Sequence, residues 1–331
     1  MLASGVSTHD PRLHTNVLGL SLRNPIILAA GTCGTLDEMA DVLDLSRVGA
    51  IITKSITPRP RDGNRAWRVA PLRAGMINAV GLANVGLDHF LEHTAPRIAN
   101  VPTRVIASVA GFSIEDYVLV AGSFDDIDAL AAIEINVSCP NVHGGVEFGL
   151  DPHALAELVT RLREVVTRKP MIVKLSPIAI ATPGFTMLDA ARTAVQPHGR
   201  DGPRGADALT IANTTPAMVI DVRTRRPRLG NTTGGLSGPA VHPIAVKLVH
   251  DVHRKLAREM HTPIIGCGGV MRWQDAAEFI LAGASAVQMG TALFADPRSP
   301  LRVASGLARW VTAQRRSSIA DLVGAMELDN D

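Results

Sequence analysis

Two lysines stand inside short apolar runs of the chain. Only five of the 33 basic residues are lysines, and two of these five are Lys54 and Lys174. Because a charge in an apolar core is costly, each ammonium group must either extend along its stem toward solvent or face a polar site. In a site, a lysine can form a Schiff base, bind a phosphate or stabilise a developing anion. We predict a functional role for both lysines.

A cysteine ends another of these runs. Cys139 follows Ser138 and precedes a proline, so the thiol is expected to begin the loop that leaves a strand. A thiol near a lysine or a group of amide donors can lose its proton and then act as a base or a nucleophile. Single cysteines are more often inert apolar residues, which is the interpretation we give to Cys33 and Cys267.

Asparagines recur at the ends of the apolar runs and in a long loop, at Asn78, Asn136, Asn141 and Asn213. Each amide offers two donors and an acceptor and does not titrate. Any one of them could be a turn residue. Together they suit a neutral, planar ligand that carries amides, such as a pyrimidine.

Glycines follow the last two apolar runs, as Gly268-Gly269 and Gly290-Thr291. Backbone N–H groups in such turns, at the start of a helix, bind phosphate in barrel enzymes. A third turn of this kind, residues 234–238, precedes another predicted helix. These glycines predict a phosphate site.

The elements that must position these residues form one repeated unit, in which a short apolar run is followed by a helical stretch. Near-continuous apolar runs are typical of parallel strands covered on both faces. We count eight runs, at Asn24–Gly31, Ala50–Thr57, Arg104–Gly111, Ala132–Cys139, Met171–Pro177, Ala208–Thr214, Pro263–Gly269 and Ala286–Phe294.

Eight strand–helix units predict a closed (β/α)8 TIM barrel, formed as a single domain over residues 1–331. The clearest helix follows the fourth run, where Asp151 can cap it and Pro152 suits its first turn. A doubly wound open sheet is the alternative fold, but no GxGxxG turn follows the first run.

Three segments lie outside the repeated unit. The stretches 58–84 and 215–238, after strands two and six, are long enough to be functional insertions. Both leave the carboxyl ends of strands, where barrel enzymes keep their active sites. Val17–Leu22 is expected to form an N-terminal hairpin that plugs the opposite end of the barrel.

The composition excludes several classes of protein. A net charge of +2 and an aromatic content of 3% argue against a nucleic-acid partner. The three cysteines are widely spaced and have no metal-ligand spacing, so we expect reduced thiols, no metal and a cytoplasmic location. The first residues form no apolar stretch, so no membrane anchor is expected.

Nine stretches of this sequence resemble the class 1 dihydroorotate dehydrogenase family, most closely its B subtype. The resemblance runs from about residue 18 to the C-terminus. It is carried by NPIILAAG, TKSITPRPRDGN, GMINAVGLANVG, INVSCPNVHGG, VKLSP, IANT, NTTGGLSGPAVHPIAVKLVH, PIIGCGGV and GASAVQMGTALFADP.

The resemblance implies an FMN-dependent oxidation of dihydroorotate to orotate in pyrimidine biosynthesis, with Cys139 as the base and Lys54 and Lys174 beside the reacting groups. FMN is expected to contact Ala30, Lys54, Ser55, Ser108, Asn136, Lys174 and Ala212, with its phosphate at Gly238, Gly268, Gly269, Gly290 and Thr291. The substrate is expected to contact Lys54, Asn78, Ala79, Val80, Gly81, Leu82, Asn136, Asn141, Asn213 and Thr214.

Partners and departures also follow from the resemblance. B-subtype members pair with an electron-transfer subunit that carries FAD and a 2Fe–2S cluster and pass electrons to NAD+, whereas A-subtype members are homodimers that use fumarate. This chain has neither a cysteine set for a cluster nor a dinucleotide fingerprint, so a separate subunit would supply both. Ser108 replaces the asparagine frequent in relatives, and Ala30 replaces the serine of some.

Two other functions remain open at the level of sequence. One is a phosphate-binding barrel lyase or aldolase that uses Lys174 as a Schiff-base amine, with Cys139 incidental. The other is a scaffold subunit that keeps the barrel without catalysis, against which the presence of Lys54, Cys139 and Lys174 argues.

Overall fold

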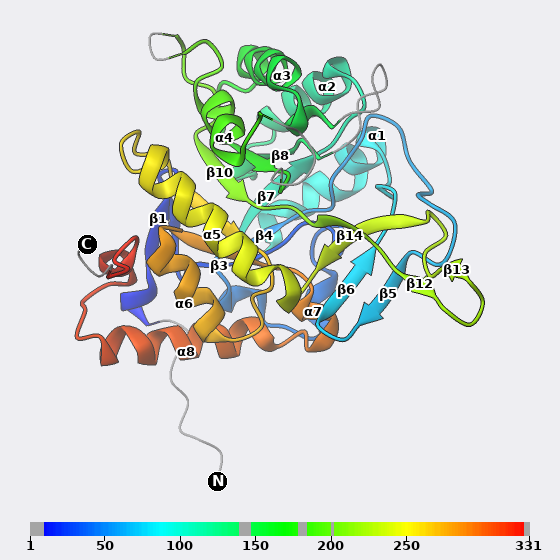
Figure 1. Ribbon diagram of the computed structural model, residues 1–331. Coiled ribbons are helices and arrows are strands. Elements are labelled where there is room, and N and C mark those ends of the chain that lie inside the picture. The colour runs from blue at the N-terminus through cyan, green and yellow to red at the C-terminus, as the bar shows by residue number, and fades with distance from the viewer. Residues whose placement is uncertain (1–9, 139–146, 178–183, 200–201, 328–331) are drawn as a thin grey trace.

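A closed barrel of eight parallel strands forms the centre of the computed structural model, which describes residues 10–138, 147–177, 184–199 and 202–327 (Figure 1). The strands follow one another around the barrel in chain order, and the last pairs with the first. They are β3 (Ile26–Leu28), β4 (Ala50–Ile52), β7 (Arg104–Val109), β8 (Ala132–Asn136), β9 (Met171–Leu175), β10 (Ala208–Ile211), β15 (Ile264–Cys267) and β16 (Ala286–Met289). The predicted barrel is confirmed, and the open sheet is wrong.

Helices surround the barrel and bury one face against it (Figure 1). They are α1 (Leu87–His89), α2 (Ile114–Asp125), α3 (Pro152–Val165), α4 (Met187–Val195), α5 (His242–Val252), α6 (Trp273–Ala282), α7 (Ala292–Ala295) and α8 (Ser299–Ala313). The predicted cap is present, since Asp151 accepts hydrogen bonds from the N–H groups of His153 and Ala154 at the start of α3. Between β3 and β4 the chain forms short 3-10 turns, Glu38–Asp41 and Leu45–Arg47, where the repeat predicts a helix.

An N-terminal hairpin closes one end of the barrel, as predicted. Its strands β1 (Thr15–Val17) and β2 (Leu20–Leu22) pair antiparallel. Val17 and Leu22 pack against the first inward-facing residues of the barrel strands, among them Ile27, Ile106 and Ile172. This apolar layer excludes water from the lower part of the barrel.

The next inward-facing layer is polar. Two residues beyond the apolar layer, which is the period of a strand, lie Glu134 on β8, Lys174 on β9, Thr210 on β10 and Gln288 on β16, and all four are buried. The barrel interior therefore has an apolar layer next to the hairpin and, one strand period further on, a polar layer that can contact a ligand.

The two insertions meet above the open end of the barrel. The first supplies β5 (Val69–Leu72) and β6 (Gly75–Asn78), and the second supplies β11 (Thr215–Met218) and β14 (Thr233–Ser237), which join in one sheet of order β11-β14-β6-β5. A small hairpin, β12 (Ile220–Asp221) with β13 (Arg226–Pro227), projects from the second insertion at the right of Figure 1. The predicted insertions after strands two and six are confirmed.

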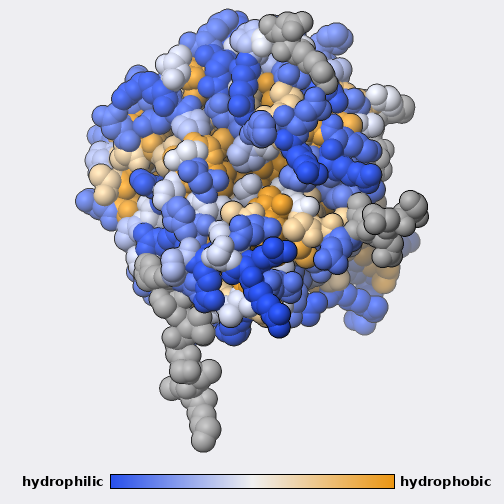
Figure 2. Space-filling model, turned by 90° about the vertical axis from the view of Figure 1, so that its left-hand side faces the viewer, coloured by the Kyte–Doolittle hydropathy of each residue, from blue (hydrophilic) through white to orange (hydrophobic). Residues whose placement is uncertain are grey.

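The molecular surface is largely hydrophilic on the side that Figure 2 shows, where apolar side chains appear in spots between polar ones. Within the described ranges, none of the helices has the length and apolar character needed to cross a bilayer.

Candidate active site

A cavity of about 660 Å³ lies between the polar layer of the barrel and the inserted sheet. Its volume is in the range of small-molecule and cofactor sites, about 300–1,000 Å³. Every predicted ligand residue that the structure describes lines it, namely Ala30, Lys54, Ser55, Asn78, Ala79, Val80, Gly81, Leu82, Ser108, Asn136, Lys174, Ala212, Asn213, Thr214, Gly238, Gly268, Gly269, Gly290 and Thr291. Residues that are far apart in sequence thus surround one space.

A buried network holds Lys174 at the floor of this cavity. The Lys174 ammonium donates to Gln288 Oε1 at 3.0 Å and lies 3.8 Å from Glu134 Oε1. Because an ammonium group only donates, this bond fixes the Gln288 amide, whose Nε2 donates to Glu134 Oε2 at 2.5 Å. Thr210 donates to the same carboxylate oxygen at 2.9 Å.

The charge of Lys174 is favoured by this environment. Burial is the largest single influence and lowers the pKa of Lys174, but Glu134, Cys267 and Cys33 together raise it, so that the pKa lies above that of an ordinary lysine. The amine therefore stays a cation at neutral pH, and Lys174 presents a positive charge from the floor of the cavity. Glu134 Oε1 has no hydrogen-bond partner among the described residues. Within this network, the ammonium group of Lys174 is the group that balances the charge of the Glu134 carboxylate.

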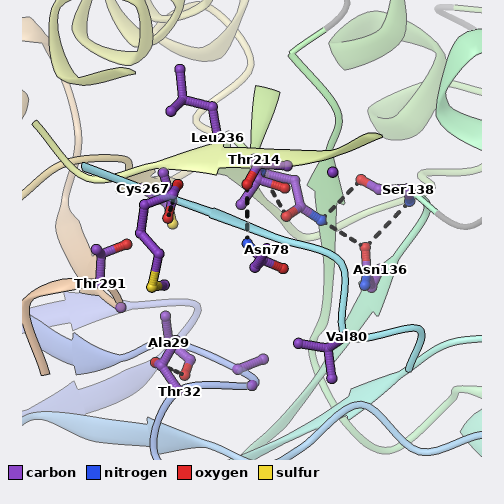
Figure 3. Close-up of a pocket in the computed structure, with 18 of the residues that line it drawn as sticks. Ala29, Thr32, Asn78, Val80, Asn136, Ser138, Thr214, Leu236, Cys267 and Thr291 are labelled. Atoms are coloured by element: carbon purple, nitrogen blue, oxygen red, sulfur yellow. Dashed lines mark hydrogen bonds between the residues drawn. The ribbon is translucent and has the colours of Figure 1, made fainter. Parts of the chain in front are cut away.

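Oriented amides form one wall (Figure 3). The N–H of Ser138 donates to Asn136 Oδ1 at 3.2 Å, which identifies that atom as an oxygen. The Asn213 amide must then direct its Nδ2 toward Asn136 Oδ1, at 3.0 Å. The Oδ1 of Asn213 accepts from the N–H of Thr214 at 2.8 Å. Backbone donors thus set the orientation of both amides before any ligand binds.

The inserted sheet covers the cavity from the opposite side. In Figure 3, β14 with Leu236 and β6 with Asn78 cross above the space that Ala29, Thr32 and Thr291 border from below. Asn78 Nδ2 donates to the carbonyl of Gly235 at 3.2 Å, which links the two insertions. The sheet therefore limits the access of solvent to a ligand in this cavity.

Glycine backbones border the cavity beside the start of α5, where 3-10 helix Pro239–Val241 begins. Gly269 has φ +72°, and a Cβ there would lie 2.6 Å from the carbonyl oxygen of Gly238, so larger residues do not fit. His242 supports the turn, since its Nδ1 donates to the carbonyl of Gly268 at 2.9 Å. Its Nε2 lies 3.1 Å from Glu278 Oε2. Close-packed glycines at a helix start fit a phosphate.

The family comparison covers nearly the whole described barrel. The sequence profile described as dihydroorotate dehydrogenase matches residues 12–311. The chain belongs to the dihydroorotate dehydrogenase family. Enzymes of this family are flavin-dependent oxidoreductases, so the cavity lies in a chain of that enzyme class.

Relatives and a solved structure agree with this assignment. The chain is 43% identical over 318 residues to the "Dihydroorotate dehydrogenase B (NAD(+)), catalytic subunit" of Pelobacter propionicus, with 96% of this chain and 99% of the relative covered. It is 44% identical to the protein of the same name from Citrifermentans bemidjiense, with the same coverage. A relative from Solibacter usitatus, 43% identical with 96% and 99% covered, is provisionally named dihydroorotate dehydrogenase A (fumarate).

The structural likeness concerns the fold. The dihydroorotate dehydrogenase of Eimeria tenella, solved in complex with ferulenol, superposes with a TM-score of 0.76 at 23% identity. The superposition covers 98% of this chain and 91% of that one.

Two predicted family residues, Cys139 and Asn141, lie outside the described residues, and their roles remain predictions. The other cysteines are described. Cys33 is buried with its Sγ 3.2 Å from the carbonyl of Ile52, and burial raises the pKa of its thiol to about 12. This agrees with an inert thiol.

Cys267, interpreted from the sequence as an inert apolar residue, has a charged neighbour. Cys267 lines the cavity (Figure 3), and the charge of Lys174 affects its thiol. Burial nevertheless raises the pKa of Cys267 above its ordinary value, so the thiol stays protonated. The sequence does not reveal this charged neighbour, because residues that are adjacent across barrel strands are far apart along the chain.

The departures at Ser108 and Ala30 have different consequences. Ser108 is buried, and its Oγ lies 2.8 Å from Ser55 Oγ, so one of the two hydroxyls donates to the other at the cavity wall. Ala30 lines the cavity without a polar side chain.

Sequence reasoning missed several polar residues of the site. Glu134, Thr210 and Gln288 form the floor network, and Glu147 and Ser176 extend the amide wall. The signal for the floor was present, since Glu134 and Gln288 are polar residues within otherwise apolar runs. No sequence pattern places Glu147 near Ser176.

Proposed function

We propose that this chain oxidises dihydroorotate to orotate in de novo pyrimidine biosynthesis, with FMN as its bound cofactor. The observation that carries the proposal is the meeting of a buried lysine, two pre-oriented amides and a glycine-lined helix start around one cavity. The family membership and the names of the relatives support the same reaction.

The cavity is suited to a flavin mononucleotide. The glycine turn at Gly238, Gly268 and Gly269 would bind the phosphate through backbone N–H groups. Gly290 and Thr291 line the same cavity and would complete that contact. The remaining proposed FMN contacts, at Ala30, Lys54, Ser55, Ser108, Asn136, Lys174 and Ala212, line the rest of this side of the cavity.

When bound, the flavin supplies a hydride acceptor. The protein supplies the base, and we assign this role to Cys139, which would remove the proton from C5 of the substrate as hydride leaves C6. A thiol that ionises near neutral pH suits this transfer. The positive charge of Lys174, held by Gln288, would stabilise the negative charge that reduction adds to the flavin.

The amide wall would bind the substrate. Asn136, Asn213 and Thr214 line the cavity with amide and hydroxyl groups, the kind of group that would pair with the imide and amide edges of a dihydropyrimidine, and Asn78 to Leu82 line it from the first insertion. Asn141 is a further proposed contact. Lys54 lines the same cavity and would meet both ligands.

The alternative lyase is disfavoured by the state of Lys174. A Schiff base requires a neutral amine, which enzymes obtain by lowering the lysine pKa. Here burial lowers the pKa of Lys174, but the Glu134 carboxylate, with Cys267 and Cys33, raises it above the ordinary value. The environment therefore favours an electrostatic role.

Partner subunits complete the proposal. We infer that electrons leave through a subunit that carries FAD and a 2Fe–2S cluster and pass to NAD+ in the cytoplasm, and that the catalytic chain forms a homodimer core. Large exposed apolar residues on the two insertions, Trp67, Met218, Ile220 and Val222, support a protein partner there.

Assays with different acceptors test this function. The cofactor released from the purified chain should have the mass of FMN. With dihydroorotate, the isolated chain should form orotate using artificial acceptors, and NAD+ should serve only after the electron-transfer subunit is added. Efficient use of fumarate by the isolated chain would contradict the NAD+ assignment, and absence of orotate with every acceptor would contradict the reaction.

A further inference from the structure

A row of hydroxyl groups connects the amide wall to an acidic side chain that the proposed reaction does not yet use. Asn213 Nδ2 lies 3.0 Å from Ser138 Oγ, which lies 2.7 Å from Ser176 Oγ. Ser176 Oγ in turn lies 2.5 Å from Glu147 Oε2. Ser138, Glu147 and Asn213 all line the cavity. The row therefore runs from the proposed substrate wall to a carboxyl group.

The hydroxyl hydrogen of Ser176 has two possible acceptors in this row. The amide of Asn213 has its nitrogen toward Ser138, so the Ser138 hydroxyl must accept there. A carboxylate only accepts, so Ser176 donates its one hydrogen to Glu147 when Glu147 is ionised. When Glu147 is protonated and donates to Ser176, the same Ser176 hydrogen is donated to Ser138 Oγ. The Ser176 hydroxyl can therefore face either neighbour, which a group must do to take a proton from one side and give one to the other.

Glu147 is placed to receive a proton and to release it. Its side chain is only partly exposed, at the point where the described chain resumes before 3-10 helix Phe148–Leu150. Burial raises the pKa of Glu147 and the Ser176 hydroxyl lowers it, with a net value above the ordinary glutamate pKa. The other titratable side chains that line the cavity are Lys54, Arg61, Glu134, Lys174 and Cys267. None of these described groups is a cause of the shift.

We propose that Glu147 is the terminal proton acceptor of a Ser138–Ser176 relay that carries the substrate proton out of the cavity. This inference rests on the proposed function, in which the C5–H bond breaks and its proton must leave the closed site. Cys139, the proposed base, gives this proton to Ser138 Oγ and returns to its thiolate, as the Ser138 proton moves to Ser176 Oγ and the Ser176 proton moves to the carboxylate of Glu147. No electrons are transferred along the relay, and the Glu147 carboxyl group then loses its proton to water.

The relay has a defined dependence on pH. Below the raised pKa of Glu147 the carboxyl group is already protonated and cannot accept. The relay therefore operates above this pKa and is lost as the pH falls through it. A variant without a carboxyl group should lack this acidic limb.

Glu147→Gln in the flavin-loaded protein tests the relay. The amide oxygen still accepts from Ser176, so the positions of the serines are kept while proton acceptance is removed. We expect the steady-state rate of orotate formation with an artificial electron acceptor to fall about 10- to 100-fold, within the range of general acid–base contributions, because Cys139 returns to its thiolate more slowly, with loss of the acidic limb of the pH profile. Ser176→Ala should give a similar fall with Glu147 intact.

Two further measurements separate proton transfer from a structural role. Formate should restore part of the rate of Glu147→Ala, because it replaces the carboxylate in the space that the truncation opens. Infrared spectra of the protein across pH should contain a protonated-carboxyl band that is absent in Glu147→Gln. Glu157→Gln, at an exposed position on α3, serves as the matched control and should leave the rate, the profile and the band unchanged.

The outcomes distinguish the relay from the reaction on which it rests. Steady-state turnover of Glu147→Gln at the wild-type rate with an unchanged pH profile would overturn the relay and leave the proposed function intact. A wild-type protein that binds flavin but is not reduced by dihydroorotate would overturn both.

Discussion

At the scale of the residue, Lys174 and Glu134 form one buried charged unit. Their side chains are 8% and 0% exposed, so neither charge is screened by water. Removing one partner of such a pair leaves an unpaired buried charge, which costs about 3–5 kcal/mol. The pair therefore affects both stability and the chemistry at the cavity floor.

Lys174→Met should separate these two effects. We expect the free energy of unfolding to fall by about 3–5 kcal/mol, and the rate of flavin reduction to fall about 100-fold, as for other lost transition-state contacts. The double variant Lys174→Met/Glu134→Gln should recover most of the stability and none of the rate. Denaturant unfolding measures the stability, and stopped-flow absorbance measures the rate of flavin reduction.

Lys247→Met, at an exposed salt bridge, is the control for the loss of a lysine. A double variant that recovers the rate of flavin reduction would disprove the catalytic role of Lys174.

Cys139→Ser tests the proposed base. A hydroxyl is a far weaker acid than a thiol, so flavin reduction should require a higher pH while flavin binding persists. The measurement is the rate of reduction as a function of pH in the wild type and the variant. Unchanged reduction near neutral pH would remove Cys139 from the mechanism.

At the scale of the element, the turn between β15 and α6 illustrates how backbone geometry makes a binding site. Gly269→Ala places a Cβ 2.6 Å from the carbonyl oxygen of Gly238 and strains a positive φ. We expect flavin affinity to fall at least about 10-fold, because about 1.4 kcal/mol of lost binding free energy has that effect. Fluorescence titration of the deflavinated protein measures this affinity.

Gly19→Ala is the matched control for that substitution. Gly19 has φ +75°, but nothing lies within 4 Å of its Cβ position. Gly19→Ala should introduce a similar backbone strain and leave the affinity for flavin unchanged. Equal affinities for flavin in the two variants would show that the Gly269 turn does not contact the cofactor.

The N-terminal hairpin should contribute to stability without contributing to chemistry. Leu22 is 1% exposed in the apolar layer at the closed end of the barrel. Leu22→Ala should lower the free energy of unfolding by about 2–5 kcal/mol, the usual cost of a core cavity, and leave the kinetics of flavin reduction unchanged. Denaturant unfolding compares it with Asn16→Ala on the exposed face of the hairpin. A stability equal to that of Asn16→Ala would show that the hairpin is no plug.

At the scale of the whole molecule, the sequence sufficed for the barrel but not for its contacts. The apolar runs and their spacing predicted the order of all eight barrel strands, because burial on both faces leaves a local pattern. The runs overestimated strand length, as at β3, because apolar residues continue into the loop. The Ser176–Glu147 contact was not predictable, since it joins loops after different strands.

The same limit applies to the identity of the site. Lys54 and Lys174 could be selected because a charge within an apolar run is unusual. Their distinct environments could not be predicted, since the floor network brings together β8, β9, β10 and β16. The positive charge of Lys174 therefore depends on its tertiary contacts and not on the local sequence.

Anaerobic mixing of the purified, flavin-loaded chain with dihydroorotate is the most direct test of the central claim. The absorbance of the oxidised flavin should disappear in a single turnover, and orotate should form in an amount equal to the flavin present. A flavin that stays oxidised, or that is reduced without orotate being formed, would contradict the assignment of this cavity to dihydroorotate oxidation.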